Sequence, residues 1–423
     1  MAPSATLVTH EPAAETQEAQ DAAPLEGPPA GMTLIPDEKL DLRSDEEIAA
    51  WLQTRHPITS EKNIWAFWHS GYTNMPQWVQ RNIINWVHRL GPEWNVHVVD
   101  HVPDSETNIY HFVDRSFFPT AFNDGTMDGP HAGQHQADLI RLPLLWTYGG
   151  IWMDVGTMLF RHVDDTCWKL IEDPDSQYEV AGFVVEMRPG VESMLNGFIA
   201  TRKNNPFIKR WHDIYAAIWG EATNSHNFHK HPLLRHIPLP HQPSEETNAP
   251  ELKVSLESMA DYLAHFVAFE RLRKLIDPSD GFNGPEYYAK HMFLTRSMKE
   301  MYHLSVVTAW SGARQFELLS AKRSGKGAVK NETWHAAEEA VNYTMANCST
   351  MKLSHGAGGL DSMLADIWDK EENSRADIAP GSFAAYMRHG SVHFDQIREL
   401  KPIELEVVTE DVHHIGVLEP VQL

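Results

Sequence analysis

The sequence predicts an α/β fold in which a mostly parallel sheet is flanked by helices. Residues 63–69 are aromatic and alternate in the manner of a strand, residues 76–89 have helical apolar spacing, and residues 94–100 are again typical of a strand. This strand–helix–strand order favours two parallel strands joined by a crossover helix. A further strand is expected at residues 179–185, where the chain is again rich in valine.

The rest of the chain divides by composition. Residues 1–35 are rich in Ala, Pro and Glu and indicate a disordered acidic tail. Residues 36–423 indicate a single domain, with a His- and Pro-rich insertion at about 221–252 and helical additions in the C-terminal part, 258–423.

Charge and cysteine usage exclude several classes of protein. The chain has 423 residues, with 35 basic against 58 acidic side chains and a net charge of −23, which disfavours nucleic acid or an anionic membrane as the main partner. No stretch approaches the ~20 uncharged apolar residues of a transmembrane span. The first residues lack the pattern of a secretory signal, and two cysteines are too few for a disulfide framework. We therefore expect a cytoplasmic protein without a transmembrane segment.

The segment 136–154 is the most informative part of the sequence. Asp138 and Arg141 are three residues apart and so share one face of the predicted helix. A Gly149-Gly150 pair allows left-handed backbone where this helix must end. A short apolar strand then leads to Asp154 at its carboxyl end, which is where ligands bind in open α/β sheets. The sequence thus predicts that two carboxylates and a guanidinium meet at one place.

Pro143 complicates the predicted helix, because proline lacks a backbone donor and predicts a kink or a break. If the helix began at Pro143 instead, Asp138 and Arg141 would lie on the preceding loop. His131 and His135 precede this helix in the prediction, and we interpret them as polar loop residues because no zinc motif accompanies them.

The pattern Ala-Asp138-x-x-Arg141, several apolar residues, then Gly-Gly-Ile-Trp-x-Asp154 resembles the DXD-type glycosyltransferases of the GT-A fold. Similar proteins are the capsular polysaccharide synthesis proteins, the family of the yeast initiating mannosyltransferase and the clostridial glucosylating toxins. Residues 60–210 carry the resemblance as a nucleotide-sugar core, with a weaker match near residue 355. The resemblance implies a GT-A-like sheet and a hexosyltransferase type of activity. A sugar would pass from a nucleoside diphosphate sugar, with a UDP-sugar favoured, to a hydroxyl of a small-molecule, lipid or glycan acceptor, with retention.

The resemblance also implies roles for particular residues. Asp138 and Arg141 would bind the donor sugar and its ribose or diphosphate, and with Asp154 they form the predicted catalytic set. Phe67, Trp68 and His69 would seat the base at the end of the first strand.

The late segment Met351-Lys-Leu-Ser-His355 resembles a further family motif. Lys352 would face the diphosphate, and His355 would complete a metal shell with Asp154 for Mn²⁺ or Mg²⁺, which prefer oxygen ligands. Gly156 stands where a DXD motif has its second acid, so strict metal dependence stays open.

Each of these assignments has a simpler alternative. Asp154 could cap a turn, Asp138 and Arg141 could form an ordinary ion pair within a helix, and Trp68 could be plain core packing. At the level of the whole protein, the missing acid at Gly156 favours a non-catalytic nucleotide-sugar binder as the main rival. A metal-dependent phosphotransferase would need a denser cluster of acids and histidines than the chain offers.

Overall fold

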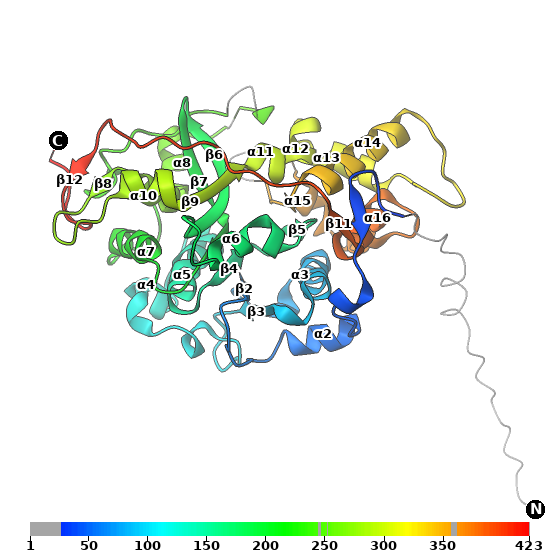
Figure 1. Ribbon diagram of the computed structural model, residues 1–423, viewed down its shortest axis with the longest axis horizontal. Helices are drawn as coiled ribbons and strands as arrows, with labels where there is room; N and C mark the ends of the chain where they lie inside the picture. Colours follow the sequence, from blue (N-terminus) through cyan, green and yellow to red (C-terminus); the bar gives the residue numbers. More distant parts are fainter. Residues whose placement is uncertain (1–26, 244–246, 252, 357–361, 423) are drawn as a thin grey trace, which may run out of the picture.

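A six-stranded sheet forms the centre of the molecule in a computed structural model that describes residues 27–243, 247–251, 253–356 and 362–422 (Figure 1). The order across the sheet is β3 (Asn95–Val99), β2 (Asn63–Phe67), β4 (Gly150–Met153), β7 (Val191–Thr201), β6 (Val180–Arg188) and β9 (Met292–Arg296). The pairs β3/β2, β2/β4 and β6/β9 are parallel, and only β7 runs against its two neighbours. The predicted mostly parallel sheet is confirmed.

The predicted strand–helix–strand unit is confirmed as β2, α3 (Gln77–Leu90) and β3. The parallel register places Ile64 beside Val96 and Phe67 beside Val99. The helix ends at Gly91, whose φ of 61° lets the chain turn into β3. The carboxyl ends of β2, β3 and β4 therefore meet at one edge of the sheet.

Helices cover both faces of this sheet, because the inner strands are apolar on both sides. Ile64 and Ala66 face one core, and Trp65 and Phe67 face the other. The first core is completed by α3 and the C-terminal helices α13 (Gly312–Ser320), α14 (Glu332–Asn347), α15 (Leu364–Trp368) and α16 (Phe383–His393). The second is completed by α5 (Ala132–Tyr148), α7 (Pro206–Trp219), α9 (Ala264–Arg273) and α10 (Gly284–His291).

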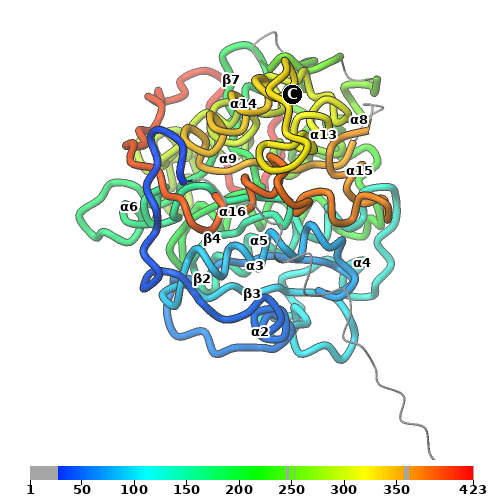
Figure 2. The backbone as a smooth tube through the Cα atoms, turned by 90° about the vertical axis from the view of Figure 1, so that its right-hand side faces the viewer, coloured from blue at the N-terminus to red at the C-terminus, as the bar shows by residue number. Residues whose placement is uncertain are grey.

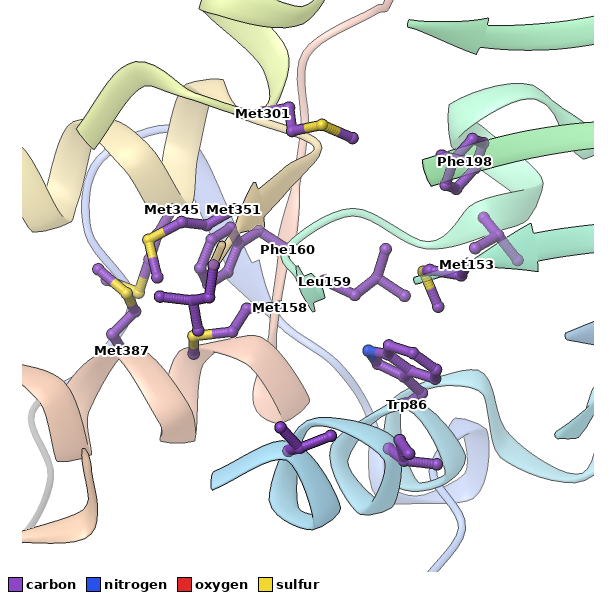
Figure 3. Close-up of a cluster of buried hydrophobic side chains, with 14 of the residues drawn as sticks. Trp86, Met153, Met158, Leu159, Phe160, Phe198, Met301, Met345, Met351 and Met387 are labelled. Atoms are coloured by element: carbon purple, nitrogen blue, oxygen red, sulfur yellow. The ribbon is translucent and has the colours of Figure 1, made fainter. Parts of the chain in front are cut away.

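A small antiparallel pair lies beside the main sheet and joins two distant parts of the chain. β5 (Thr157–Leu159) pairs with β10 (Thr350–Lys352). Methionines gather around this pair, where their flexible side chains fill the space toward α3 and α16 (Figure 3). Those labelled are Met153, Met158, Met301, Met345, Met351 and Met387. The pair fixes Lys352 close to the end of β4.

The predicted tail is too long. β1 (Met32–Leu34) pairs antiparallel with β11 (Phe394–Gln396), so the N-terminal segment runs along the C-terminal third of the chain (Figure 2). Met32 is buried in the first core, which is the physical reason that residues 27–35 are ordered. Residues 1–26 of the predicted tail lie outside the described residues.

The C-terminal part is less helical than predicted. It supplies β9 to the main sheet, and after β11 the chain crosses the molecule to β12 (His413–His414), which pairs with β8 (Leu275–Ile276) (Figure 1). The first of the predicted helical additions are α8 (Leu256–Tyr262) and α9. Within the described part of the predicted insertion, four residues pack into the second core, namely Phe228, Leu233, Leu234 and Ile237.

Two further findings concern the described part of the chain. Cys167 and Cys348 are free and buried. No helix there combines the length and the apolar character needed to cross a membrane.

Asp377 joins α3 to α16 through two arginines, and its removal is expected to destabilise the fold. Its fully buried carboxylate accepts hydrogen bonds from Arg81 Nη2 at 2.6 Å and Arg388 Nε at 2.7 Å. Asp377→Ala leaves both guanidinium groups without their anion and is expected to lower the free energy of unfolding by about 3–5 kcal/mol in urea titrations. Asp165→Ala removes an exposed ion pair with Lys169 and should change the free energy of unfolding by about 1 kcal/mol or less. Equal effects of the two changes would contradict this account.

Candidate active site

The helix α5 carries Asp138 and Arg141 and is continuous through Pro143. Of the predicted kink or break at this proline, the break is therefore wrong, and so is the alternative that places the two charged residues on a loop. The helix begins after His131, so His135 lies within it and is buried rather than in a polar loop. Burial of α5 against the sheet and α7 outweighs the hydrogen bond that Pro143 cannot make.

Two glycines turn the chain from α5 into β4. Gly149 has a φ of 70° and Gly150 a φ of 103°, both in the left-handed region. The indole N–H of Trp65 donates to the Gly149 carbonyl at 2.9 Å. A Cβ on Gly150 would lie 2.3 Å from the carbonyl oxygen of Asn63. The glycines thus let β4 pack directly against β2 and bring Asp154 to the carboxyl edge of the sheet.

Arg141 lies between the two carboxylates, as the sequence predicted. Its Nη2 is 2.9 Å from Asp138 Oδ1 and 3.8 Å from Asp154 Oδ1. The guanidinium also stacks over the ring of Trp152 at 4.9 Å, and Trp152 Nε1 donates to Asp154 Oδ1 at 2.8 Å. The side chain of Arg141 is only 4% exposed, whereas that of Asp154 is 25% exposed. Solvent therefore reaches this group of charges from the side of Asp154.

Asn196 on β7 is a site residue that the sequence did not single out. Its side-chain amide donates to Asp138 Oδ1 at 2.9 Å, and its backbone carbonyl accepts from Arg141 Nη1 at 2.6 Å. The same amide lies 3.2 Å from Nδ1 of the buried His265. Its contact with α5 depends on the antiparallel pairing of β7 with β4, which the sequence did not predict.

The electrostatics of Asp138 keep it ionised. Burial by itself raises the pKa of this carboxyl, but Arg141 and the hydrogen bond with His135 outweigh burial and lower the pKa to about 2. Tyr215 adds a further hydroxyl 3.4 Å from Asp138 Oδ2. Burial lowers the pKa of His265 to about 3, so its imidazole is neutral at neutral pH. Asp138 is therefore a hydrogen-bond acceptor across the physiological range.

Lys352 reaches the site from β10. Its Nζ lies 2.8 Å from Asp154 Oδ2. Burial raises the pKa of Asp154, but Lys352 and then Arg141 lower it more, so the net shift is downward. Lys352 therefore forms an ion pair with Asp154, and its side chain is 15% exposed.

The predicted metal shell of Asp154 and His355 finds little support in the contacts. His355 Nε2 lies 2.7 Å from Asp369 Oδ2, and the other oxygen of Asp369 accepts from Trp78 Nε1. Across the described ranges, no three His, Cys, Asp or Glu side chains form a group that could hold a metal ion. The donor set around Asp154 is one carboxylate with two cations beside it, which does not fit Mn²⁺ or Mg²⁺.

The segment 67–69 lies at the same edge of the sheet, because β2 is parallel to β4. Phe67 is 6% exposed and belongs to the second core, so its ring is used for packing. Trp68 is half-buried, and its indole N–H is buried without a hydrogen-bond partner among the described residues. His69 is exposed and lies against the first turn of α5 near Gly133. Of the three residues predicted to bind the base, only Trp68 and His69 are therefore accessible to a ligand.

Comparisons with known proteins identify the family of the chain. The family model of the capsular polysaccharide synthesis proteins matches residues 38–236. The chain is 62% identical to the O-glycosyltransferase braB of Annulohypoxylon truncatum, over 93% of this chain and 94% of that protein. It is 43% identical to the glycosyltransferase afumC of Aspergillus fumigatus, over 90% and 97%, and 40% identical to the O-glycosyltransferase PaGT of Phomopsis amygdali, over 93% and 97%. The chain therefore belongs to the same family of glycosyltransferases as these proteins, and its core carries the capsular polysaccharide synthesis domain.

Proposed function

We propose that this glycosyltransferase moves a hexose from a nucleoside diphosphate sugar, with UDP as the favoured carrier, to a hydroxyl oxygen of its acceptor. The observation that carries the proposal is the position of Arg141 between Asp138 and Asp154 at the carboxyl edge of the sheet. The relatives named O-glycosyltransferases support oxygen as the accepting atom. The mostly parallel sheet with its single reversed strand is consistent with a GT-A-type fold.

The site would act mainly by positioning and by charge. The guanidinium of Arg141 is fixed by Asp138, the carbonyl of Asn196 and the ring of Trp152, so its remaining donors are held in place before a ligand arrives. The ionised Asp138 can accept hydrogen bonds from sugar hydroxyls. The indole N–H of Trp68, which has no hydrogen-bond partner among the described residues, would donate to a carbonyl of the base.

In the proposed reaction, the bond between C1 of the sugar and the diphosphate oxygen breaks, and its electron pair leaves with the diphosphate. The acceptor oxygen forms the new bond to C1. With retention, the acceptor approaches on the face that the diphosphate leaves, so the acceptor proton passes to the departing phosphate oxygen. This path needs no separate protein base, and we name none.

A panel of UDP-, GDP- and ADP-sugars tests the proposed function. One donor is expected to raise the thermal stability of the wild-type chain, by about 2.7 kcal/mol at 100 times its dissociation constant. The same donor should be hydrolysed slowly in the absence of acceptor. Asp138→Asn is expected to lose this turnover, because an amide cannot replace the anion that holds Arg141, whereas Asp213→Asn, in a half-exposed pair with Lys209, should keep it.

Two outcomes would contradict the proposal. The first is that no nucleotide sugar of the panel raises the thermal stability of the chain. Stabilisation without any hydrolysis or transfer would favour the non-catalytic binding protein instead.

A further inference from the structure

Asp154 stands where a DXD-type enzyme binds its metal, but both of its oxygens already face donors. Oδ2 is paired with Lys352 Nζ at 2.8 Å. Oδ1 accepts from Trp152 Nε1 at 2.8 Å and lies 3.8 Å from Arg141 Nη2. A carboxylate surrounded in this way is the anion of an ion-pair network, and a divalent cation would have to displace a lysine to bind it.

The backbone excludes a second acid at the position that the motif requires. A Cβ on Gly156 would lie 2.3 Å from the carbonyl oxygen of Leu353, and this contact is fixed because the Leu353 N–H donates to the Gly156 carbonyl at 2.7 Å. Across the site, a Cβ on Gly197 would lie 2.9 Å from Asp154 Oδ2. Neither neighbour of Asp154 can therefore carry a further carboxylate without movement of the chain.

Lys352 is held in place by its strand rather than by its side chain alone. Its backbone pairs with Thr157 of β5 and donates to the Met301 carbonyl at 3.1 Å. The preceding Met351 is buried in the methionine-rich core (Figure 3). An ammonium group has three donors, so Lys352 can bind Asp154 and a second anion at once.

We propose that Lys352 and Arg141 stabilise the leaving diphosphate in place of a divalent metal, and that Asp154 is the counter-ion that positions both cations. This inference rests on the proposed function. As the bond from C1 to the diphosphate oxygen breaks, the electron pair collects on that oxygen. In this proposal the ammonium of Lys352 and the positive charge of the Arg141 guanidinium stabilise that negative charge. The bonds that form and break are those of the transfer described above.

The wild-type chain provides the first test. After chelation and removal of divalent ions, it is expected to bind UDP in a titration calorimeter and to turn over its donor as fast as it does with added Mn²⁺. In the absence of nucleotide, Mn²⁺ titrated alone should give no saturable binding. Loss of turnover on chelation, with recovery on adding Mn²⁺, would overturn the inference.

Variants of Lys352 provide the second test. Lys352→Met is expected to lower turnover about 100-fold, as loss of one preorganised donor does, and added Mn²⁺ should not restore it. Lys352→Arg keeps the charge and should recover part of the loss. Lys169→Met removes another lysine from a pair with an aspartate, at an exposed position, and should leave turnover unchanged. Circular dichroism of each variant checks that it is folded, and unchanged turnover in folded Lys352→Met would contradict the inference.

The outcomes separate the two proposals. If neither UDP nor GDP binds with or without Mn²⁺, and no donor is turned over, the proposed function fails and the inference fails with it. If donor turnover is found but only with Mn²⁺, the proposed function stands and the inference alone is wrong.

Discussion

Replacing Arg141 by lysine is expected to lower sugar transfer by about 100-fold to 1,000-fold, although the chain still folds. The substitution keeps the positive charge beside Asp138, so the buried carboxylate is not left alone. A lysine ammonium cannot reproduce the planar group that contacts the Asn196 carbonyl and stacks on Trp152 at the same time. Steady-state kinetics with the donor identified by thermal stabilisation measure the effect.

Arg202 offers a matched control for this substitution. It pairs with a carboxylate as Arg141 does, through Nε and Nη2 to Glu61, but its side chain is 47% exposed. Arg202→Lys should leave transfer unchanged. If Arg141→Lys retains wild-type turnover in a folded chain, the placement of Arg141 in the donor site is wrong.

A large effect on stability from a single methyl group is expected at Gly150. Gly150→Ala should lower the free energy of unfolding by about 3 kcal/mol or more, from left-handed backbone strain together with overpacking. The φ of 103° is unfavourable for alanine, and the new Cβ would meet the carbonyl oxygen of Asn63 at 2.3 Å. Chemical denaturation measures the change.

A substitution at Gly190 separates the backbone strain from the overpacking. Its φ of 72° is also in the left-handed region, but a Cβ there would have no neighbour within 4 Å in the described part of the chain. Gly190→Ala should therefore cost only the strain, about 1 kcal/mol. Equal losses in the two variants would show that the contact with Asn63 is relieved by a small shift of β2.

Local patterns predicted the elements that depend on short stretches of chain. The alternation in residues 63–69 and the helical spacing in 76–89 correspond to β2 and α3 with small errors at the ends. The helix, the Gly-Gly turn and the strand that ends at Asp154 were predicted together, and they bring Asp138, Arg141 and Asp154 to one edge as expected. These features are encoded in side-chain periodicity and in the backbone freedom of glycine.

Other features could not be predicted because they depend on partners far apart in the chain. Nothing near Met32 indicates that it pairs with a strand more than 350 residues later, so the tail was extended too far. Pro143 predicted a break from its own chemistry, and the burial of α5 overrode it. The positions of Asn196 and His265 could not be predicted, because they depend on β7 packing beside α5 and on α9 packing against β7.

The sequence by itself determined that an aspartate follows a buried strand and that the helix before this strand carries an arginine and a second acid, since those spacings are local. Only the tertiary structure decided what surrounds that aspartate. The β5–β10 pair brings a lysine to its second oxygen, and the close backbone at Gly156 leaves no room for a second acid. Strand pairing over about 200 residues sets this arrangement, and such pairing is selected by the burial of both cores together rather than by any short segment.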